Sequence, residues 1–146
     1  MQLKLLTAIL LVVPLSIQTL PELKLPSRQE LQCLVKNTYY EARGEPQEGQ
    51  IAVAQVVLNR VDHKDYPKTI CRVVYQQKQF SWTAHKQKAE INWQEWQGSL
   101  NASVLAYNLP RINATHYHNL TVHPKWNLQW TKTIKNHVFY TAEGRE

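Results

Sequence analysis

The sequence predicts an α+β fold that is mainly helical and has a small β-sheet late in the chain. Between residues 27 and 107, apolar residues recur at helical spacing in three long segments. From Thr115 onward, β-branched and aromatic residues are frequent, which is typical of strands. The chain has 146 residues, and roughly 120 of them follow an apolar leader, a length that suits one domain.

The first predicted helix ends on a carboxylate. Ser27, followed three residues later by Glu30, has the pattern of a capping box. Apolar residues then recur at helical spacing, at Leu31, Leu34, Val35, Thr38 and Ala42. This register places Glu41 on the inward face, in the last turn before Gly44 and Pro46 end the helix.

An inward carboxyl group is a candidate general acid. Burial disfavours its charged form and raises its pKa, so that it can hold a proton near neutral pH and donate it. The alternative is an ordinary salt bridge between Glu41 and Arg43 or a distant lysine.

The second helix is predicted to be the buried centre of the domain. Pro46 suits its first turn, and the segment from Ile51 to Val61 is apolar nearly all round. Asn59 and Arg60 interrupt this segment and are expected to hydrogen-bond to backbone groups. After a polar turn, Thr69 is expected to cap a short helix that turns Ile70, Val73 and Val74 inward.

Two segments that contain tryptophan follow. Residues 79–82 read as a loop or short strand in which aromatic and polar side chains could bind a sugar, and the alternative is a core Phe80 and Trp82. Ser81 lacks the glycine-flanked elbow of a nucleophile. A third long helix is then predicted to end before Pro110. Its inward face is predicted to carry Trp93, Trp96, Leu100, Val104 and Tyr107.

The late sheet is predicted from two segments. Residues 116–118 and 131–140 read as strands, joined by a loop that holds Pro124, Trp126 and Trp130.

Residues 1–20 read as a signal peptide or an uncleaved signal anchor, because one lysine precedes an apolar run that is too short for a full transmembrane helix. Export would place Cys33 and Cys71 in an oxidising compartment, where a disulfide between them could add roughly 2–4 kcal/mol of stability. Two buried free thiols are the alternative. The net charge of +6 favours an acidic partner, although the lysines are scattered along the chain.

From Leu31 to Tyr140 the sequence resembles the SleB family of spore-cortex-lytic cell-wall hydrolases. The resemblance rests on YYEARGEPQEGQIAVAQVVLNRV (39–61), Tyr66-Pro67, ICRVVY (70–75), QFSW (79–82), THYH (115–118), Pro124-Lys125-Trp126 and NHVFY (136–140). It implies a lysozyme-like fold with the acid at the base of a cleft, and a catalytic domain over residues 27–146. The sequence departs from the family at Lys135, where a glycine commonly precedes Asn-His.

The resemblance also implies a reaction. A two-carboxylate glycosidase needs a second acid across the scissile bond, and the sequence offers no convincing one. Family members behave as lytic transglycosylases that use one glutamate and no cofactor, which assigns the acid and base roles to Glu41. The bond would be the β-1,4 linkage between MurNAc and GlcNAc. The match implies that the cleft is lined by Gln79, Phe80, Ser81, Trp82, His116, Tyr117, His118, Trp126 and Tyr140.

Two other classes of function stay open. His116 and His118 lie two apart on a predicted strand, so they could hold zinc in an amidase or peptidase, with His123 or His137 as a third ligand. A basic binding module without catalysis is the other class. The reading we favour is an exported monomer whose partner is the peptidoglycan glycan strand rather than nucleic acid, and which meets a membrane only through its leader.

Overall fold

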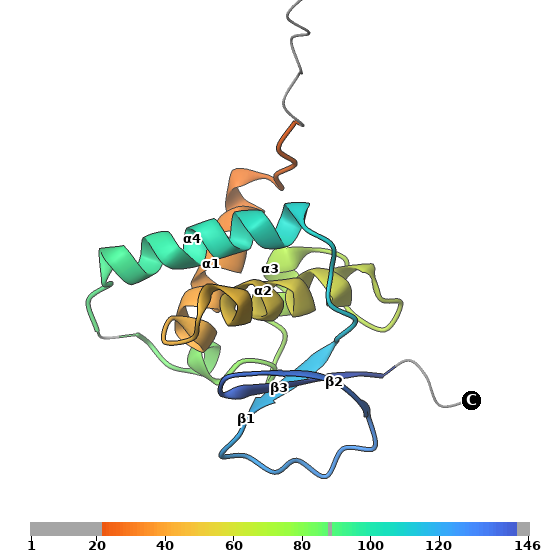
Figure 1. Ribbon diagram of the computed structural model, residues 1–146. Helices are drawn as coiled ribbons and strands as arrows, with labels where there is room; N and C mark the ends of the chain where they lie inside the picture. Colours follow the sequence, from red (N-terminus) through yellow and green to blue (C-terminus); the bar gives the residue numbers. More distant parts are fainter. Residues whose placement is uncertain (1–21, 88, 143–146) are drawn as a thin grey trace, which may run out of the picture.

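The computed structural model describes residues 22–87 and 89–142, so the predicted leader lies outside the described residues. Figure 1 shows helices stacked on one small sheet. The elements in chain order are α1 (Arg28–Ala42), α2 (Gln47–Asp62), α3 (Ile70–Val74), the 3₁₀ helix η1 (Ser81–Ala84), α4 (Trp93–Asn108), β1 (His116–Asn119), β2 (Gln129–Ile134) and β3 (His137–Thr141).

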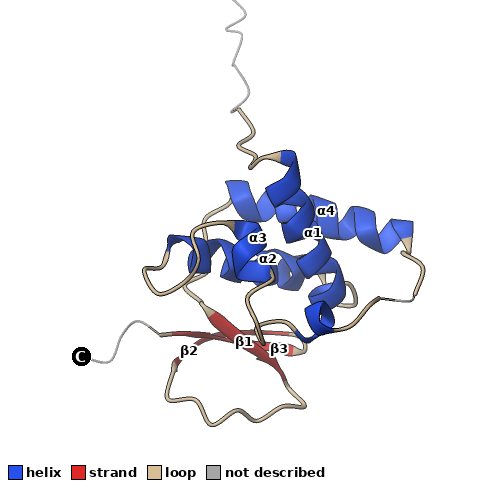
Figure 2. Ribbon diagram, turned by 180° about the vertical axis from the view of Figure 1, so that it is seen from behind, coloured by secondary structure: helices blue, strands red, loops and turns tan. Residues whose placement is uncertain are grey.

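The sheet has the order β1-β3-β2, and both pairs of strands are antiparallel. The four α-helices of the described chain lie on one side of it (Figures 1 and 2), while the loop of residues 120–128 hangs on the other side. β1 is therefore an edge strand with a helical side and an outer side. The predicted α+β class is confirmed.

Helix α1 begins as predicted, but only half of the capping box forms. The Ser27 hydroxyl accepts a hydrogen bond from the Glu30 backbone N–H at 3.3 Å. The Glu30 carboxylate does not complete the box. It accepts bonds from the backbone N–H groups of Ile70 and Cys71, at the start of α3. Glu30 thus ties α1 to α3 and suits the positive end of that short helix.

Helix α2 is the buried centre of the domain, as its sequence predicts. Its middle residues pack on the other helices on one side and on the sheet on the other. The two polar residues are satisfied by a distant stretch of backbone: Asn59 donates to the carbonyls of Ile112 and Ala114, and Arg60 donates to that of Thr115. These bonds fix the segment that leads into β1.

Helix α4 presents a different face from the one predicted. Trp93 is 72% exposed, and Trp96, Leu100, Val104 and Tyr107 are only half-buried. The buried face consists of the small residues Ser99, Ala102, Ser103 and Ala106. Small side chains let α4 approach α1 and α2 closely, and Ser103 there donates a hydrogen bond to the Ser99 carbonyl. The inward tryptophan stripe was therefore wrong.

Two further predictions about local structure were inexact. Residues 131–140 form a hairpin of two strands rather than one strand, and Trp130 lies in β2 rather than in the loop. The segment from Gln79 to Trp82 enters a 3₁₀ helix and is not a strand. The short helix capped by Thr69 is present as predicted, with the Thr69 hydroxyl bonded to the Arg72 N–H at 3.3 Å.

The hairpin turn explains the glycine that the family prefers at position 135. Lys135 has a φ of 45°, a conformation that costs a residue with a Cβ about 1 kcal/mol or more and costs glycine nothing. The turn is held by Glu45, whose carboxylate accepts bonds from the backbone and side-chain nitrogens of Asn136. Lys135 itself donates to the Gly44 carbonyl at 3.1 Å.

Replacing Lys135 with Gly is expected to raise the free energy of unfolding by about 0.5–1 kcal/mol, because relief of the left-handed conformation exceeds the added flexibility of the unfolded chain. Urea denaturation measures this change. Lys135→Ala is the matched control, since it also loses the bond to Gly44 but keeps the unfavourable φ, and it should not stabilise. Equal stabilities for the two variants would contradict the explanation.

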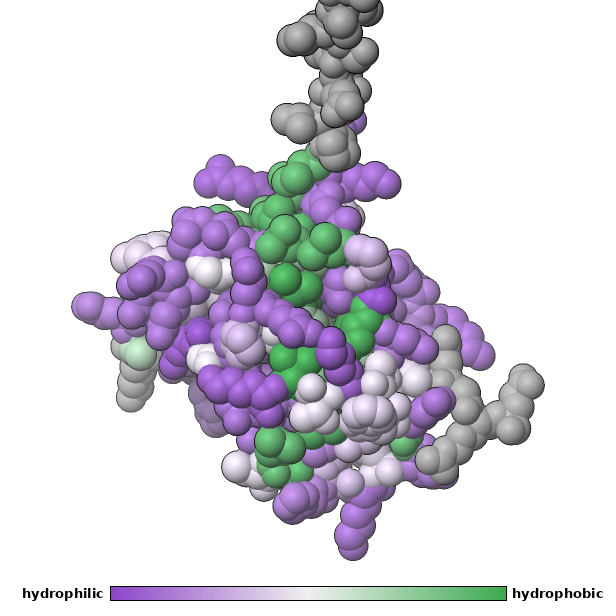
Figure 3. Space-filling model, viewed as in Figure 1, coloured by the Kyte–Doolittle hydropathy of each residue, from purple (hydrophilic) through white to green (hydrophobic). Residues whose placement is uncertain are grey.

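Cys33 in α1 and Cys71 in α3 are joined by a disulfide, as predicted. The described part of the chain has no helix that is both long and apolar enough to cross a membrane. Apolar residues gather at the surface beneath the start of the described chain (Figure 3), where a hollow of about 540 Å³ is lined by Leu25, Leu31, Leu100, Val104 and Leu105, among others.

Candidate active site

Glu41 lies in the last turn of α1, where the helix reaches the edge strand of the sheet. Its side chain is partly buried, and its Oε2 accepts a hydrogen bond of 2.7 Å from the Tyr117 hydroxyl of β1. Tyr117 reaches Glu41 because it points to the helical side of β1. Helix and sheet thus hold the carboxyl group from two directions.

A buried cation lies behind this pair. Arg60 is 5% exposed in the last part of α2. Its Nε donates to the Thr115 carbonyl at 2.8 Å, and its Nη1 donates to Gln79 Oε1 at 3.1 Å. The guanidinium also lies over the rings of Tyr66 and Phe80, 5.3 and 5.5 Å from their centroids. Backbone, amide and rings fix its position.

These neighbours set the protonation of Glu41. Burial raises the pKa of the carboxyl group above its ordinary value of 4.5, and the bond from Tyr117 and the charge of Arg60 only partly oppose that rise. Burial and the Glu41 charge hold the pKa of Tyr117 well above its ordinary value, so the phenol stays a donor. The arrangement suits a group that gives up a proton and then persists as a carboxylate.

Tyr117→Phe is expected to move the alkaline limb of the pH–rate profile to higher pH. The reason is that the hydroxyl stabilises the ionised form of Glu41, so its loss raises the pKa of the acid further and keeps it protonated over a wider range. Rates of peptidoglycan solubilisation measured across pH test this. A limb that stays in place, or moves to lower pH, would contradict the role given to Tyr117.

An aromatic wall stands beside the acid. The ring of Tyr40, the residue before Glu41, stacks on Trp82 with centroids 4.8 Å apart. Trp82 is only partly exposed, and its indole N–H donates to Asn37 Oδ1 at 3.0 Å. Tyr75, which is half exposed, lies edge-on to Trp82 with the ring centroids 5.8 Å apart. A partly open, hydrogen-bonded indole next to an acid has the composition of a sugar-binding wall.

The other residues of the segment 79–82 differ in how exposed they are. Gln79 is exposed and reaches Arg60, while Ser81 is exposed at the start of η1. Phe80 is 4% exposed and belongs to the core cluster that includes Leu34 and Val57. Phe80 is therefore placed to support Arg60 from below rather than to contact a ligand.

The His-Tyr-His segment is divided between the two sides of the sheet, because successive residues of a strand point to opposite faces. Tyr117 faces the helices and Glu41. His116 and His118 face the outer side, where both rings lie within 6 Å of Trp126. Tyr140 joins them, stacked on His118 at 5.4 Å. The residues expected in one cleft thus form two groups on either side of β1.

The histidine geometry does not favour a metal site. The ring nitrogens of His116 face the hydroxyls of Thr115 and Tyr66, and those of His118 face the Asn119 carbonyl and the Tyr140 hydroxyl. Within residues 22–87 and 89–142, no three His, Cys, Asp or Glu side chains are grouped to hold a metal ion.

Other described carboxylates are engaged elsewhere. Glu30 binds the start of α3, and Glu45 holds the hairpin turn. Three others form ion pairs at the surface, Glu48 with Lys132, Asp62 with Arg111, and Glu95 with Arg43, and Asp65 lies beside His63. Glu22 and Glu90 are exposed. Glu41 differs from them in its setting, because burial raises the pKa of its carboxyl group.

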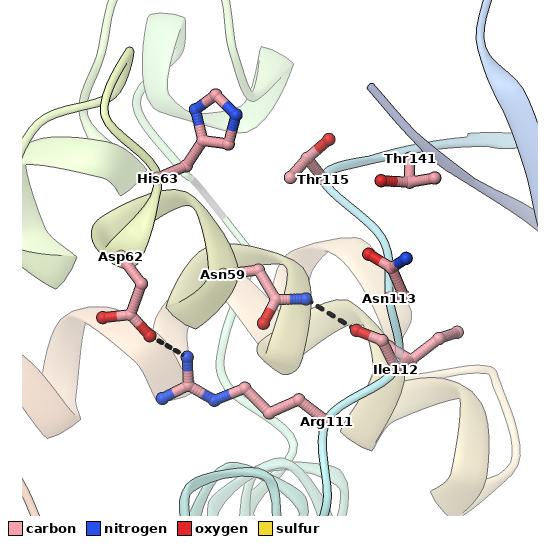
Figure 4. Close-up of a pocket in the computed structure, with 8 residues that line it drawn as sticks. All are labelled: Asn59, Asp62, His63, Arg111, Ile112, Asn113, Thr115 and Thr141. Atoms are coloured by element: carbon pink, nitrogen blue, oxygen red, sulfur yellow. Dashed lines mark hydrogen bonds and ion pairs between the residues drawn. The ribbon is translucent and has the colours of Figure 1, made fainter. Parts of the chain in front are cut away.

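A separate cavity of about 350 Å³ lies at the end of α2. Figure 4 shows its lining, with Asn59 bonded to the Ile112 carbonyl and Asp62 paired with Arg111. Glu41 is not part of this lining. The cavity lies where α2 ends against the segment that leads into β1.

Sequence reasoning missed two members of the site. Tyr40 could have been found from its place directly before Glu41. Arg60 stood out only as a charge inside an apolar helix, and its partner Gln79 is not local in the sequence.

The fold and this site define a lysozyme-like domain, in which a helix ends on a partly buried acid at the edge of a small sheet. Residues 44–140 match the model of the Cell Wall Hydrolase family, and the chain belongs to that family. The predicted resemblance to SleB-type enzymes is confirmed.

Relatives and solved structures agree. The chain is 34% identical to a spore cortex-lytic enzyme of Oceanobacillus iheyensis, over 77% of this chain and 42% of that protein. It is 31% identical to that of Bacillus subtilis, over 77% and 38%. The chain thus spans less than half the length of these relatives.

The catalytic domain of the germination-specific lytic transglycosylase SleB from Bacillus anthracis aligns with a TM-score of 0.69 at 31% identity, covering 80% of this chain and 97% of that one. The SleB catalytic domain of Bacillus cereus gives 0.66 at 30% identity, covering 80% and 95%.

Proposed function

We propose that this protein cleaves the β-1,4 bond between MurNAc and GlcNAc in peptidoglycan, as a lytic transglycosylase with Glu41 as its single acid and base. One observation supports this above the others. Burial raises the pKa of Glu41, while the hydrogen bond from Tyr117 and the charge of Arg60 stabilise its ionised form. The similarity to an enzyme described as a lytic transglycosylase supports the same reaction.

The reaction proceeds in two proton transfers. Glu41 first gives its proton to the glycosidic oxygen, and the bond from that oxygen to the anomeric carbon of MurNAc breaks. The carboxylate then accepts the proton of the MurNAc 6-hydroxyl, whose oxygen closes on the same anomeric carbon. The product is a 1,6-anhydro sugar, water is not consumed, and Glu41 ends protonated as it began.

The neighbours of Glu41 serve the middle of this cycle. Between the two transfers Glu41 is an anion in a partly buried site, and the hydrogen bond from Tyr117 and the charge of Arg60 oppose the cost of that state.

The sugar next to the scissile bond is assigned to the aromatic wall. Trp82 is partly exposed and stacks on Tyr40, and Gln79 and Ser81 offer exposed polar groups in the same segment. Aromatic faces match the apolar face of a pyranose, and amides and hydroxyls match its hydroxyl groups. Phe80 holds this wall from the core.

Product analysis tests the proposal. Purified peptidoglycan is digested with the full chain, and the soluble fragments are identified by mass spectrometry. Anhydromuramoyl ends are expected. Reducing ends would instead show hydrolysis and overturn transglycosylation, whereas release of free peptides from intact glycan would overturn glycosidase action.

The setting of this activity is also a proposal. Action on the cell wall and the Cys33–Cys71 disulfide both fit an exported protein, in the periplasm or outside the cell, with the domain of residues 27–146 acting as a monomer. A leader in residues 1–20 would supply export and any contact with a membrane.

A further inference from the structure

The outer side of the sheet carries a partly exposed aromatic surface that contains none of the groups to which the proposed proton transfers are assigned. We define the outer surface as His116, His118, Trp126, Trp130 and Tyr140. Trp130 is directly opposite Tyr140 in the register of β2 and β3, and Tyr140 contacts both His118 and Trp126. Trp126 is 43% exposed and Trp130 is 59% exposed. In Figures 1 and 2, this side of the sheet carries the loop of residues 120–128, and no helix of the described residues covers it.

Exposed rings need a reason, because tryptophan on an open sheet face invites aggregation. Hydrogen-bonding groups lie among these rings, and the loop beside them also exposes Leu120 and Val122. Both histidines and Tyr140 belong to the surface, and the Trp130 indole N–H donates to the Thr133 hydroxyl at 3.2 Å. Flat rings beside polar donors and acceptors match sugars better than they match an apolar protein face.

One exposed positive charge lies in the loop beside the surface. Between Glu95 and Glu143 the sequence contains no Asp or Glu, but Arg111 and Lys132 are paired with Asp62 and Glu48 from α2. Lys125 is exposed in the loop beside Trp126. The positive charge of Lys125 beside the rings complements a chain of amino sugars that bears carboxylates.

We propose that the outer surface binds a second stretch of peptidoglycan, with its rings on the sugars and Lys125 near the carboxylates of the lactyl groups or peptide stems. This rests on the proposed function, which supplies the polymer. Because β1 is an edge strand with Glu41 and Tyr117 on one side and the outer surface on the other, a strand crossing this edge could touch both. The surface would hold the enzyme on insoluble wall between cleavages.

Binding in the absence of cleavage tests this proposal. Glu41→Gln is mixed with insoluble peptidoglycan sacculi, and the fraction that sediments with them is measured against sacculus concentration. Adding Trp130→Ala is expected to weaken binding about tenfold, whereas Trp93→Ala, which removes a still more exposed indole from the start of α4, is expected to leave it unchanged. Equal effects from the two variants, or none, would overturn the proposal.

Two charge-reversal variants test the same proposal without altering the strand that holds Trp130. Lys125→Glu changes an exposed loop residue and is expected to weaken binding and flatten its dependence on salt, and Lys64→Glu makes the same change in the exposed turn after α2 as its control. Polyaspartate and soluble glycan fragments are also compared as competitors for binding to the sacculi. Equal competition by the two would overturn the proposal, because it would show that the surface is attracted to any polyanion. If the Trp130 and Lys125 variants bind sacculi less well but the wild type releases reducing ends, the binding proposal holds and the transglycosylase assignment fails. If the variants bind as well as their controls but the wild type releases anhydromuramoyl ends, the assignment holds and the binding proposal fails.

Discussion

Glu41→Gln is expected to lower the rate of peptidoglycan cleavage by at least about 10³-fold, because the amide can neither protonate the leaving oxygen nor accept the proton of the 6-hydroxyl. The fold should be kept, since an amide oxygen can still accept the bond from Tyr117. The release of anhydromuramoyl fragments, followed by mass spectrometry, measures the loss. Glu48→Gln, at the exposed start of α2, is the matched control and should retain full activity.

The same variant should be at least as stable as the wild type at neutral pH. Glu41 has a raised pKa in the folded protein, so its ionisation costs more there than in the unfolded chain, and this penalty is present above the folded pKa. It is absent below the ordinary value of 4.5, where the group is protonated in both states. Denaturation at pH 7 and pH 4 should therefore show an advantage for Gln that fades in acid. An inactive variant that is also unstable at both values would remove the case for a catalytic role.

The position of this acid could be predicted because local rules decide it. Ser27 fixes where α1 starts, the apolar period fixes which face is inward, and Gly44 and Pro46 fix where it ends. The burial of α2 follows equally directly from its composition. Nothing local, however, says that Arg60 meets Gln79 and the Thr115 carbonyl, because those bonds depend on how the segment into β1 returns across α2.

The errors arose where a local pattern had two solutions. In α4, the large residues and the small residues both recur at helical spacing, and close approach to α1 and α2 selects the small ones. In the sheet, Lys135-Asn136 lacks the glycine that marks a two-residue turn, so the hairpin read as one strand. The division of His116 and Tyr117 between two faces could have been predicted from strand alternation, but the edge position of β1 could not.

Loss of the disulfide should be the largest single change in stability. Cys33 and Cys71 are 38 residues apart, and in the chain-entropy model a loop of that length stabilises the fold by up to about 4 kcal/mol. The double variant Cys33→Ala with Cys71→Ala is therefore expected to lose about 2–4 kcal/mol in urea denaturation. A reducing agent should bring the wild type to the same midpoint and leave the variant unchanged.

Loss of the disulfide should leave the cleavage rate of the folded protein unchanged. Cys33 precedes Glu41 by about two helical turns, or roughly 12 Å along α1. Glu30 also continues to join α1 to α3 through its bonds to the Ile70 and Cys71 backbone. Cleavage rates measured well below the unfolding midpoint should therefore match those of the wild type, with an unchanged pH profile. A shifted alkaline limb would mean instead that the disulfide sets the position of α1 against β1, and so the bond between Tyr117 and Glu41 on which the acid depends.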